Sequence, residues 1–243
     1  MAMVPKRQLA AILFADIQDF TALVQQDEDQ AKILQHKFHK VFETDIKSSN
    51  GRIIHFQGDG VCCSFRSAVD AVLTAIKIQE QMLKEPNVPL RIGIHLGDVL
   101  VEGKEIFGDG VNVASRVESF AIPGGVFITD IVYHEIRNHT GIKAMPLGKY
   151  EFKNVKDPVE IYAISNPGMV VPMPKTLFGK GKAVVKTRKR NLIVVALLVL
   201  VLLAFSYFIF IKNSVHDKSI AVLPFINLSN NAGEEYLCDG ITE

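Results

Sequence analysis

The chain has 243 residues, with 27 Lys and Arg against 26 Asp and Glu, so its formal net charge is +1. That balance argues against a nucleic-acid-binding protein and an acidic tail protein, and we expect no nucleic-acid partner. The charge is unevenly distributed. Residues 1–166 carry 18 basic and 21 acidic groups, residues 167–190 carry seven basic groups and no acid, residues 191–211 carry no charge, and residues 212–243 carry two basic and five acidic groups.

Cysteine usage and the first residues limit the class of protein further. Three cysteines without a Cys-x-x-Cys pair exclude a disulfide scaffold and a Cys-based zinc site. Cys62 and Cys63 are neighbours in an apolar run, which predicts that they point to opposite faces of one strand. Free thiols suit a reducing compartment. The start of the chain, MAMVPKRQ, has no apolar segment, which predicts that there is no secretory signal peptide.

Strands and helices alternate in the first region. The predicted elements are a buried strand at Leu9–Ile17, a long amphipathic helix at Thr21–Ile46, strands at Arg52–Phe56 and Val61–Phe65, a helix at Ala68–Leu83, and strands at Leu90–Leu96 and Val99–Glu102. The apolar positions of the first helix are Leu23, Ile33, Leu34, Phe38, Val41 and Phe42. The order βαββαβ matches the split-βαβ, ferredoxin-like plan of an α+β fold.

Two carboxylates far apart in the sequence are expected to meet in this topology. In a ferredoxin-like sheet the first strand runs antiparallel beside the third, so the end of strand one lies near the turn between strands two and three. Asp16 ends the first strand and Asp59 lies in that turn. Either residue alone is typical of a helix cap or a turn, but two carboxylates together are what a divalent cation site needs.

A second candidate cluster follows a glycine-rich turn at Gly108–Gly110. A helix is predicted to begin near Val111, and Asn112 and Arg116 are spaced so that they share one face of it. An amide and a guanidinium directed at one spot suit a sugar oxygen and a phosphate that gains negative charge. Taken alone, the same pattern is more typical of a solvated helix start in which Arg116 and Glu118 are neighbours without a function.

Several short motifs stand in fixed order between residues 7 and 164. They are Phe14-Ala15-Asp16-Ile17 with Phe20-Thr21, Gly58-Asp59-Gly60, RIGIHLG from Arg91, GDGVNVASR from Gly108, Leu147-Gly148, Phe152-Lys153-Asn154, and PVEIY from Pro158. In order and spacing they resemble the catalytic domain of the class III adenylate and guanylate cyclases. The expected fold over residues 1–166 is therefore the α+β, ferredoxin-like βαββαβ class III nucleotidyl cyclase domain, followed by a single transmembrane helix.

The resemblance implies a role for each matching residue. Asp16 and Asp59 match the two aspartates that hold two divalent cations, Mg²⁺ or Mn²⁺. Asn112 and Arg116 match the pair that positions the ribose and stabilises the transition state, and Lys153 matches a lysine that binds the triphosphate. In this family the active site lies across a homodimer interface. One subunit would supply the two aspartates, and its partner would supply His55, Glu105, Asn112, Arg116 and Lys153.

Two positions that read the purine in this family depart from its usual pattern. His55 stands where adenylate cyclases usually have a lysine, and Glu105 where they usually have an aspartate or a threonine. Guanylate cyclases use a glutamate at the position of His55 and a cysteine at the position of Glu105, so this chain has neither of them at its proper position. Glu105 keeps an acceptor for the adenine amino group and His55 keeps a donor, so ATP is favoured over GTP as the substrate.

The uncharged stretch 191–211 (NLIVVALLVLVLLAFSYFIFI) is predicted to be a transmembrane helix. About 20 apolar residues in a helix span the hydrocarbon core of a bilayer, about 30 Å. The basic, Pro- and Gly-containing residues 167–190 form a predicted linker, and its positive charge places the first region in the cytoplasm. We therefore expect a single-pass protein of the cell membrane, in bacteria the inner membrane, with the catalytic domain cytoplasmic.

The last 32 residues, 212–243, are predicted to lie outside the cytoplasm. From Ser219 they resemble the start of a TolB-like region, incomplete here, that follows the cyclase domain in a group of bacterial membrane cyclases. The function that these patterns predict is a membrane-anchored adenylate cyclase that makes 3′,5′-cyclic AMP and pyrophosphate from ATP by two-metal catalysis. The alternatives are a guanylate or dual-specificity cyclase, and a weakly active, cyclase-like signalling scaffold.

Overall fold

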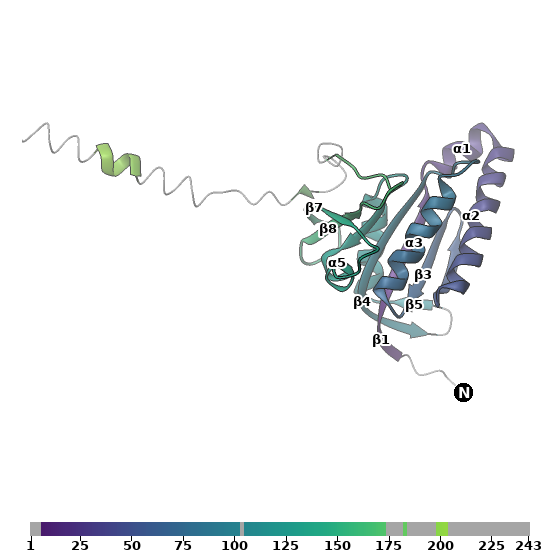
Figure 1. Ribbon diagram of the computed structural model, residues 1–243, viewed down its shortest axis with the longest axis horizontal. Coiled ribbons are helices and arrows are strands. Elements are labelled where there is room, and N and C mark those ends of the chain that lie inside the picture. The colour runs from purple at the N-terminus through teal and green to yellow at the C-terminus, as the bar shows by residue number, and fades with distance from the viewer. Residues whose placement is uncertain (1–5, 103–104, 174–181, 184–197, 204–243) are drawn as a thin grey trace, which may run out of the picture. The chain divides into compact units, whose positions relative to one another are not determined.

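A computed structural model describes residues 6–102, 105–173, 182–183 and 198–203 (Figure 1). The chain divides into two compact units, Met1–Val185 and Lys186–Glu243. In the second unit only residues 198–203 are described, and they form an exposed helical segment. The candidate functional site lies entirely in the first unit.

The first unit contains nine strands and five helices in its described residues. In chain order they are β1 (Lys6–Ile17), α1 (Phe20–Gln26), α2 (Glu28–Ser48), β2 (Arg52–Gln57), β3 (Gly60–Phe65), α3 (Ala68–Met82), β4 (Leu90–Glu102), β5 (Glu105–Phe107), α4 (Asp109–Phe120), β6 (Val126–Thr129), α5 (Asp130–Ile136), β7 (Ala144–Glu151), β8 (Val159–Ile164) and β9 (Lys182–Ala183).

All nine strands belong to one mixed sheet. Its order is β2-β3-β1-β4-β6-β8-β7-β9, and β5 pairs with β4 outside this path. β1 lies antiparallel between β3 and β4, whereas β4 and β6 are parallel. The order β2-β3-β1-β4 confirms the predicted ferredoxin-like arrangement, and it places the end of β1 beside the β2–β3 turn.

The alternation of side chains along β1 separates two cores. Leu13, Ala15 and Ile17 belong to a large buried cluster with residues of α2, α3 and α5, whereas Ala10 and Ile12 belong to a smaller cluster with Ala114 of α4. Helices α2 and α3 therefore cover one face of the sheet (Figure 1) and α4 packs on the other.

The two adjacent cysteines follow the same alternation. Cys63 lies in the larger cluster and Cys62 in the smaller one, so the prediction that they point to opposite faces is confirmed. Burial raises the pKa of the Cys62 thiol to about 12 and raises that of Cys63 well above its usual value. Both thiols are therefore protonated at neutral pH and serve as small core residues.

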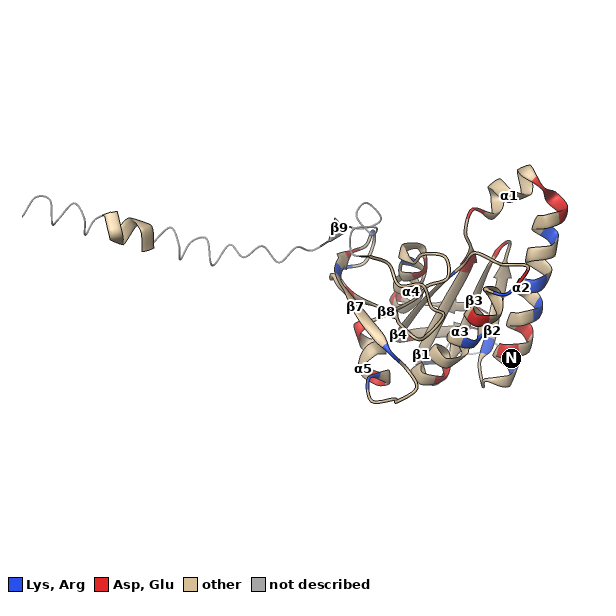
Figure 2. Cartoon of the chain, turned by 45° about the horizontal axis from the view of Figure 1, so that its top comes forward, with Lys and Arg blue, Asp and Glu red and all other residues tan. Residues whose placement is uncertain are grey.

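The predicted helix at Thr21–Ile46 is wrong as one element. It is interrupted at Asp27, whose extended backbone ends α1 and whose side chain accepts a hydrogen bond of 2.9 Å from the Gln30 N–H, so it caps α2. Ile33, one of the apolar positions of the predicted amphipathic helix, is 56% exposed. Helix α2 carries charges of both signs (Figure 2), among them the Glu28–Lys32 ion pair at 2.7 Å.

The strands predicted at Leu90–Leu96 and Val99–Glu102 form one continuous strand, β4. Gly97 and Asp98 do not end the strand, because the whole of β1 pairs with β4, from Lys6 opposite Val101 to Ile17 opposite Leu90. The tertiary partner therefore overrides the local turn signal.

The predicted transmembrane helix lies mostly outside the described residues. Of residues 191–211 the structure describes 198–203, and the described part of the chain contains no helix that is long and apolar enough to cross a membrane. Within the predicted linker, Lys182–Ala183 form β9 and pair with β7, while residues 174–181 and 184–190 are not described. The predicted TolB-like region at 212–243 lies outside the described residues as well.

Candidate active site

The register of β1 with β3 brings the two predicted metal-binding aspartates together. Asp16 lies opposite Gly60, the residue that follows Asp59. The backbone N–H of Ile17 donates a hydrogen bond of 3.2 Å to the carbonyl of Asp59, which fixes the turn against the end of β1. The predicted meeting of Asp16 and Asp59 at this edge of the sheet is confirmed as a placement.

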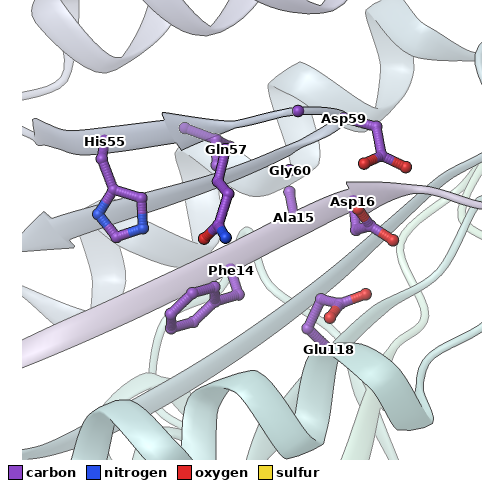
Figure 3. Close-up of a pocket in the computed structure, with 10 residues that line it drawn as sticks. Phe14, Ala15, Asp16, His55, Gln57, Asp59, Gly60 and Glu118 are labelled. Atoms are coloured by element: carbon purple, nitrogen blue, oxygen red, sulfur yellow. The ribbon is translucent and has the colours of Figure 1, made fainter.

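A pocket of about 430 Å³ opens at this point of the sheet (Figure 3). The acidic residues that line it are Asp16, Asp59 and Glu118. Two polar residues of β2, His55 and Gln57, form another part of the wall, and Phe14 lies across from them. The pocket therefore joins an acidic end to an end that carries imidazole, amide and aromatic groups.

An arginine neutralises part of the acidic end. Arg91 lies opposite Asp16 in the β1–β4 register, and its Nη2 atom is 2.6 Å from Asp16 Oδ2. The same nitrogen is 3.2 Å from Oε1 of Glu118 on α4. Neither Arg91 nor Glu118 could be assigned a role from the sequence, because their pairing depends on a register between distant segments.

Glu118 reaches this site because α4 packs very closely on β4. A Cβ atom added to Gly93 would lie 2.1 Å from the backbone nitrogen of Glu118, so only glycine fits at this crossing. The Glu118 side chain is only 10% exposed. The alternative interpretation, a solvated helix start that includes Glu118, is therefore wrong at Glu118. Asn112, nearer the start of α4, is exposed.

The acidic end has more negative charge than Arg91 neutralises. Burial raises the pKa of Glu118 to about 7, against the opposing attraction of Arg91. Burial and the nearby Asp16 carboxylate also raise the pKa of Asp59. The three carboxylates repel one another, and the single guanidinium of Arg91 offsets this repulsion only in part. A divalent cation would relieve the rest.

The donor set fits Mg²⁺ or Mn²⁺ at Asp16 and Asp59. Both are hard cations that prefer oxygen ligands, and they are bound through one or two carboxylates together with substrate phosphates. Among the described residues no three His, Cys, Asp or Glu side chains are grouped as a complete metal centre. The candidate site therefore provides two carboxylates and leaves the remaining positions to a phosphate ligand and water.

Four of the other predicted site residues do not line this pocket. Asn112 and Arg116 lie on α4, Glu105 is the exposed first residue of β5, and Lys153 is exposed in the turn between β7 and β8. His55 lies in the same pocket as the aspartates of its own chain. The assignment of these residues to two subunits stays a prediction.

The raised pKa of Glu118 predicts a pH-dependent stability in the absence of metal. Its pKa in the folded chain, about 7, is higher than the ordinary value of 4.5, so the folded state binds more protons and loses stability as the pH rises from about 5 to about 7. In chelator, we expect the melting temperature of wild type to fall over this pH range relative to that of Glu118→Gln. The corresponding loss in the free energy of unfolding of wild type is on the order of 2–3 kcal/mol. Parallel curves for the two proteins would contradict this.

Comparison with known proteins identifies the class to which this fold and site belong. The Adenylate and Guanylate cyclase catalytic domain family matches residues 3–166. The chain therefore belongs to the class III adenylate and guanylate cyclase catalytic domain family.

Individual relatives agree with this membership. The chain is 33% identical over 253 residues to putative adenylate cyclase 3 of Rhizobium meliloti (strain 1021), covering 98% of this chain and 37% of that protein. It is 31% identical to an adenylate cyclase of Streptomyces coelicolor over 127 residues, covering 51% of this chain and 33% of that protein. The chain thus spans about a third of the length of these two relatives.

A solved structure shows the same fold. The adenylate/guanylate cyclase/hydrolase from Silicibacter pomeroyi is 30% identical, and the superposition covers 66% of this chain and 98% of that chain with a TM-score of 0.62. The matched share of this chain is close to that of the family match, residues 3–166, within which the acidic pocket lies.

Proposed function

We propose that the chain is an adenylate cyclase, which converts ATP to 3′,5′-cyclic AMP and pyrophosphate as a homodimer. The observation that carries this proposal is the placement of Asp16 and Asp59 in one acidic pocket of a cyclase-family domain. The reaction forms a bond between the 3′-oxygen and the α-phosphorus and breaks the bond from that phosphorus to the leaving pyrophosphate. The proton of the 3′-hydroxyl is released to the solvent.

Each candidate side chain has a separate role in this reaction. Asp16 and Asp59 would hold two divalent cations, which lower the pKa of the attacking hydroxyl and neutralise charge on the leaving oxygens. Arg116 stabilises the negative charge that grows on the α-phosphate, an interaction that is strongest in the transition state. Asn112 orients the ribose and Lys153 binds the triphosphate.

A second copy of the chain completes this site. Asn112, Arg116 and Lys153 lie outside the pocket that holds the aspartates, and Asn112 and Lys153 are exposed. That none of the three lines the pocket supports a homodimer in which one subunit contributes the carboxylates and its partner these three residues. A two-fold interface would form two such sites.

The preference for ATP follows from the polar groups that face the base. Glu105 has acceptor oxygens for the adenine amino group, and the imidazole of His55 has a donor for adenine N1. His55 lines the pocket wall on β2. GTP is the second candidate substrate, because a histidine reads the purine less stringently than the longer lysine.

A turnover assay with the purified full chain in detergent tests the proposal. Incubation with ATP or GTP, each with Mn²⁺ or Mg²⁺, is expected to give cyclic AMP as the main product and none in chelator. Cyclic GMP as the main product would favour the guanylate cyclase. Nucleotide binding without either product would favour a signalling scaffold and contradict the enzyme.

His55→Lys tests whether residue 55 reads the base. Lysine restores the longer donor, so kcat/KM for ATP relative to GTP is expected to rise about tenfold, as for one added hydrogen bond to the base. His36→Lys is a matched control, because His36 is an exposed histidine of α2 that does not line the pocket. An unchanged ratio in His55→Lys would show that residue 55 does not select the purine.

We also propose that residues 191–211 anchor the enzyme in the cell membrane with the catalytic domain in the cytoplasm. The support is the uncharged apolar stretch and the seven basic residues before it. Parallel anchors raise the local concentration of the catalytic domains and so favour the dimer. A chain that ends at Val185 is therefore expected to appear in the soluble fraction and to lose specific activity on dilution, and constant activity on dilution would contradict this.

A further inference from the structure

The turn that carries Asp59 is held from two sides. On one side the Ile17 N–H donates to the Asp59 carbonyl, as described above. On the other side Nε2 of Gln35, on α2, donates a hydrogen bond of 3.1 Å to the carbonyl of Gly58. Gly58 has a left-handed backbone (φ 62°), so this turn has a geometry that favours glycine.

Helix α2 is a firm support for the Gln35 amide. Leu34 and Phe38, on either side of Gln35, are buried in the larger core. The imidazole of His39 stacks on Phe56 of β2 with ring centroids 4.2 Å apart, and the Phe38 ring meets Phe56 edge-on at 6.1 Å. Because Phe56 lies two residues before Gly58, both β2 and its turn are fixed to the same helix.

The turn needs this support because it brings like charges together. Gly60 lies so close to Asp16 that a Cβ atom added there would be 3.3 Å from Asp16 Oδ1. The carboxylates of Asp16 and Asp59 repel each other, and that repulsion pushes the turn away from β1 in the absence of a cation. A donor on the Gly58 carbonyl opposes that displacement.

We propose that Gln35 is a positioning residue for the metal site: its amide holds the Gly58 carbonyl and thereby fixes Asp59 at the distance from Asp16 at which both bind one cation. The inference rests on the proposed function, because it assigns the two aspartates to a divalent cation. Gln35 does not line the pocket and acts only through the turn that carries Asp59, so the expected effect of its loss is on metal affinity.

Two substitutions remove the hydrogen bond without changing the charge of the chain. Gln35→Met keeps the length of the side chain and loses the donor, whereas Gln35→Asn keeps the amide and is one methylene too short. The matched control is Lys37→Met, because Lys37 is also on α2 and donates to backbone carbonyls, those of Lys84 at 2.6 Å and Pro86 at 2.8 Å, in a different loop.

The measurement is Mn²⁺ binding to the full chain in detergent, read as free Mn²⁺ by electron paramagnetic resonance without nucleotide. Both Gln35 variants are expected to bind Mn²⁺ about threefold to tenfold more weakly than wild type, the equivalent of one lost hydrogen bond. Lys37→Met is expected to bind as wild type does. Cooperative melting in chelator is expected for wild type and the Gln35 variants alike, which shows that all are folded. KM for ATP at saturating Mn²⁺ is expected to be the same for all three.

Three outcomes would overturn the inference, and each points to a different error. If wild type binds Mn²⁺ and both Gln35 variants bind it equally well, the role of Gln35 is wrong and the proposed function is unaffected. If wild type binds no Mn²⁺ and makes no cyclic nucleotide, the proposed metal site is wrong and the role of Gln35 with it. A loss of affinity in Lys37→Met equal to that of the Gln35 variants would show a general effect of α2 and would also overturn it.

Discussion

Asp59→Asn is expected to lower cyclic nucleotide formation by at least about a hundredfold, because an amide in place of a carboxylate cannot neutralise a divalent cation. Asparagine has nearly the same shape, so the β2–β3 turn and its bond from the Ile17 N–H are kept. The substitution also removes a partly buried charge and its repulsion with Asp16, and burial and this repulsion raise the pKa of Asp59 in the wild type. The variant is therefore expected to melt at least as high as wild type in chelator while it loses Mn²⁺ affinity.

Asp98→Asn is the matched control for this loss. Asp98 is a β4 aspartate whose side chain is 57% exposed and pairs with Arg7 at 3.0 Å, outside the pocket. Such surface ion pairs contribute little to stability, so activity and melting temperature are expected to stay close to those of wild type. Equal activity in Asp59→Asn and Asp98→Asn would show that the acidic pocket does not hold the catalytic metals.

Coexpression of Asp59→Asn with Arg116→Ala is expected to restore activity that neither variant has alone. If the aspartates and Arg116 of one site come from different subunits, a mixed dimer has one site with both lesions and one intact site. Random pairing makes half of the dimers mixed, so the mixture is expected to reach about a quarter of wild-type activity. Each single variant is expected to lose about a hundredfold or more in kcat.

A second pair of variants separates complementation from other effects. Asp16→Asn and Asp59→Asn damage the same half of the site, so every dimer of that mixture has two damaged sites and no activity is expected to return. Recovery in this control would contradict the assignment of the two aspartates to one half-site. No recovery in the Asp59→Asn and Arg116→Ala mixture would show that each chain builds its own site, as the position of His55 beside its own aspartates allows.

The α+β plan and the two aspartates could be predicted from sequence because their signals are local. The apolar run of β1, the β2–β3 hairpin with its Gly58-Asp59-Gly60 turn and the helix after Gly108 each depend on neighbouring residues. The topology rule then placed Asp16 beside Asp59. The two main errors, one helix for α1 and α2 and two strands for β4, occurred where a capping residue and a tertiary partner decided the outcome.

By itself the sequence determined which chemical groups the protein has and in what order: carboxylates at 16 and 59, an amide and a guanidinium at 112 and 116, and an uncharged stretch at 191–211. Only the tertiary structure decided which groups stand beside them. The β1–β4 register placed Arg91 on Asp16, the close approach at Gly93 brought Glu118 to Arg91, and the packing of α2 placed Gln35 on the Asp59 turn. Each of these contacts joins segments at least 23 residues apart, so its geometry depends on how the sheet and helices pack.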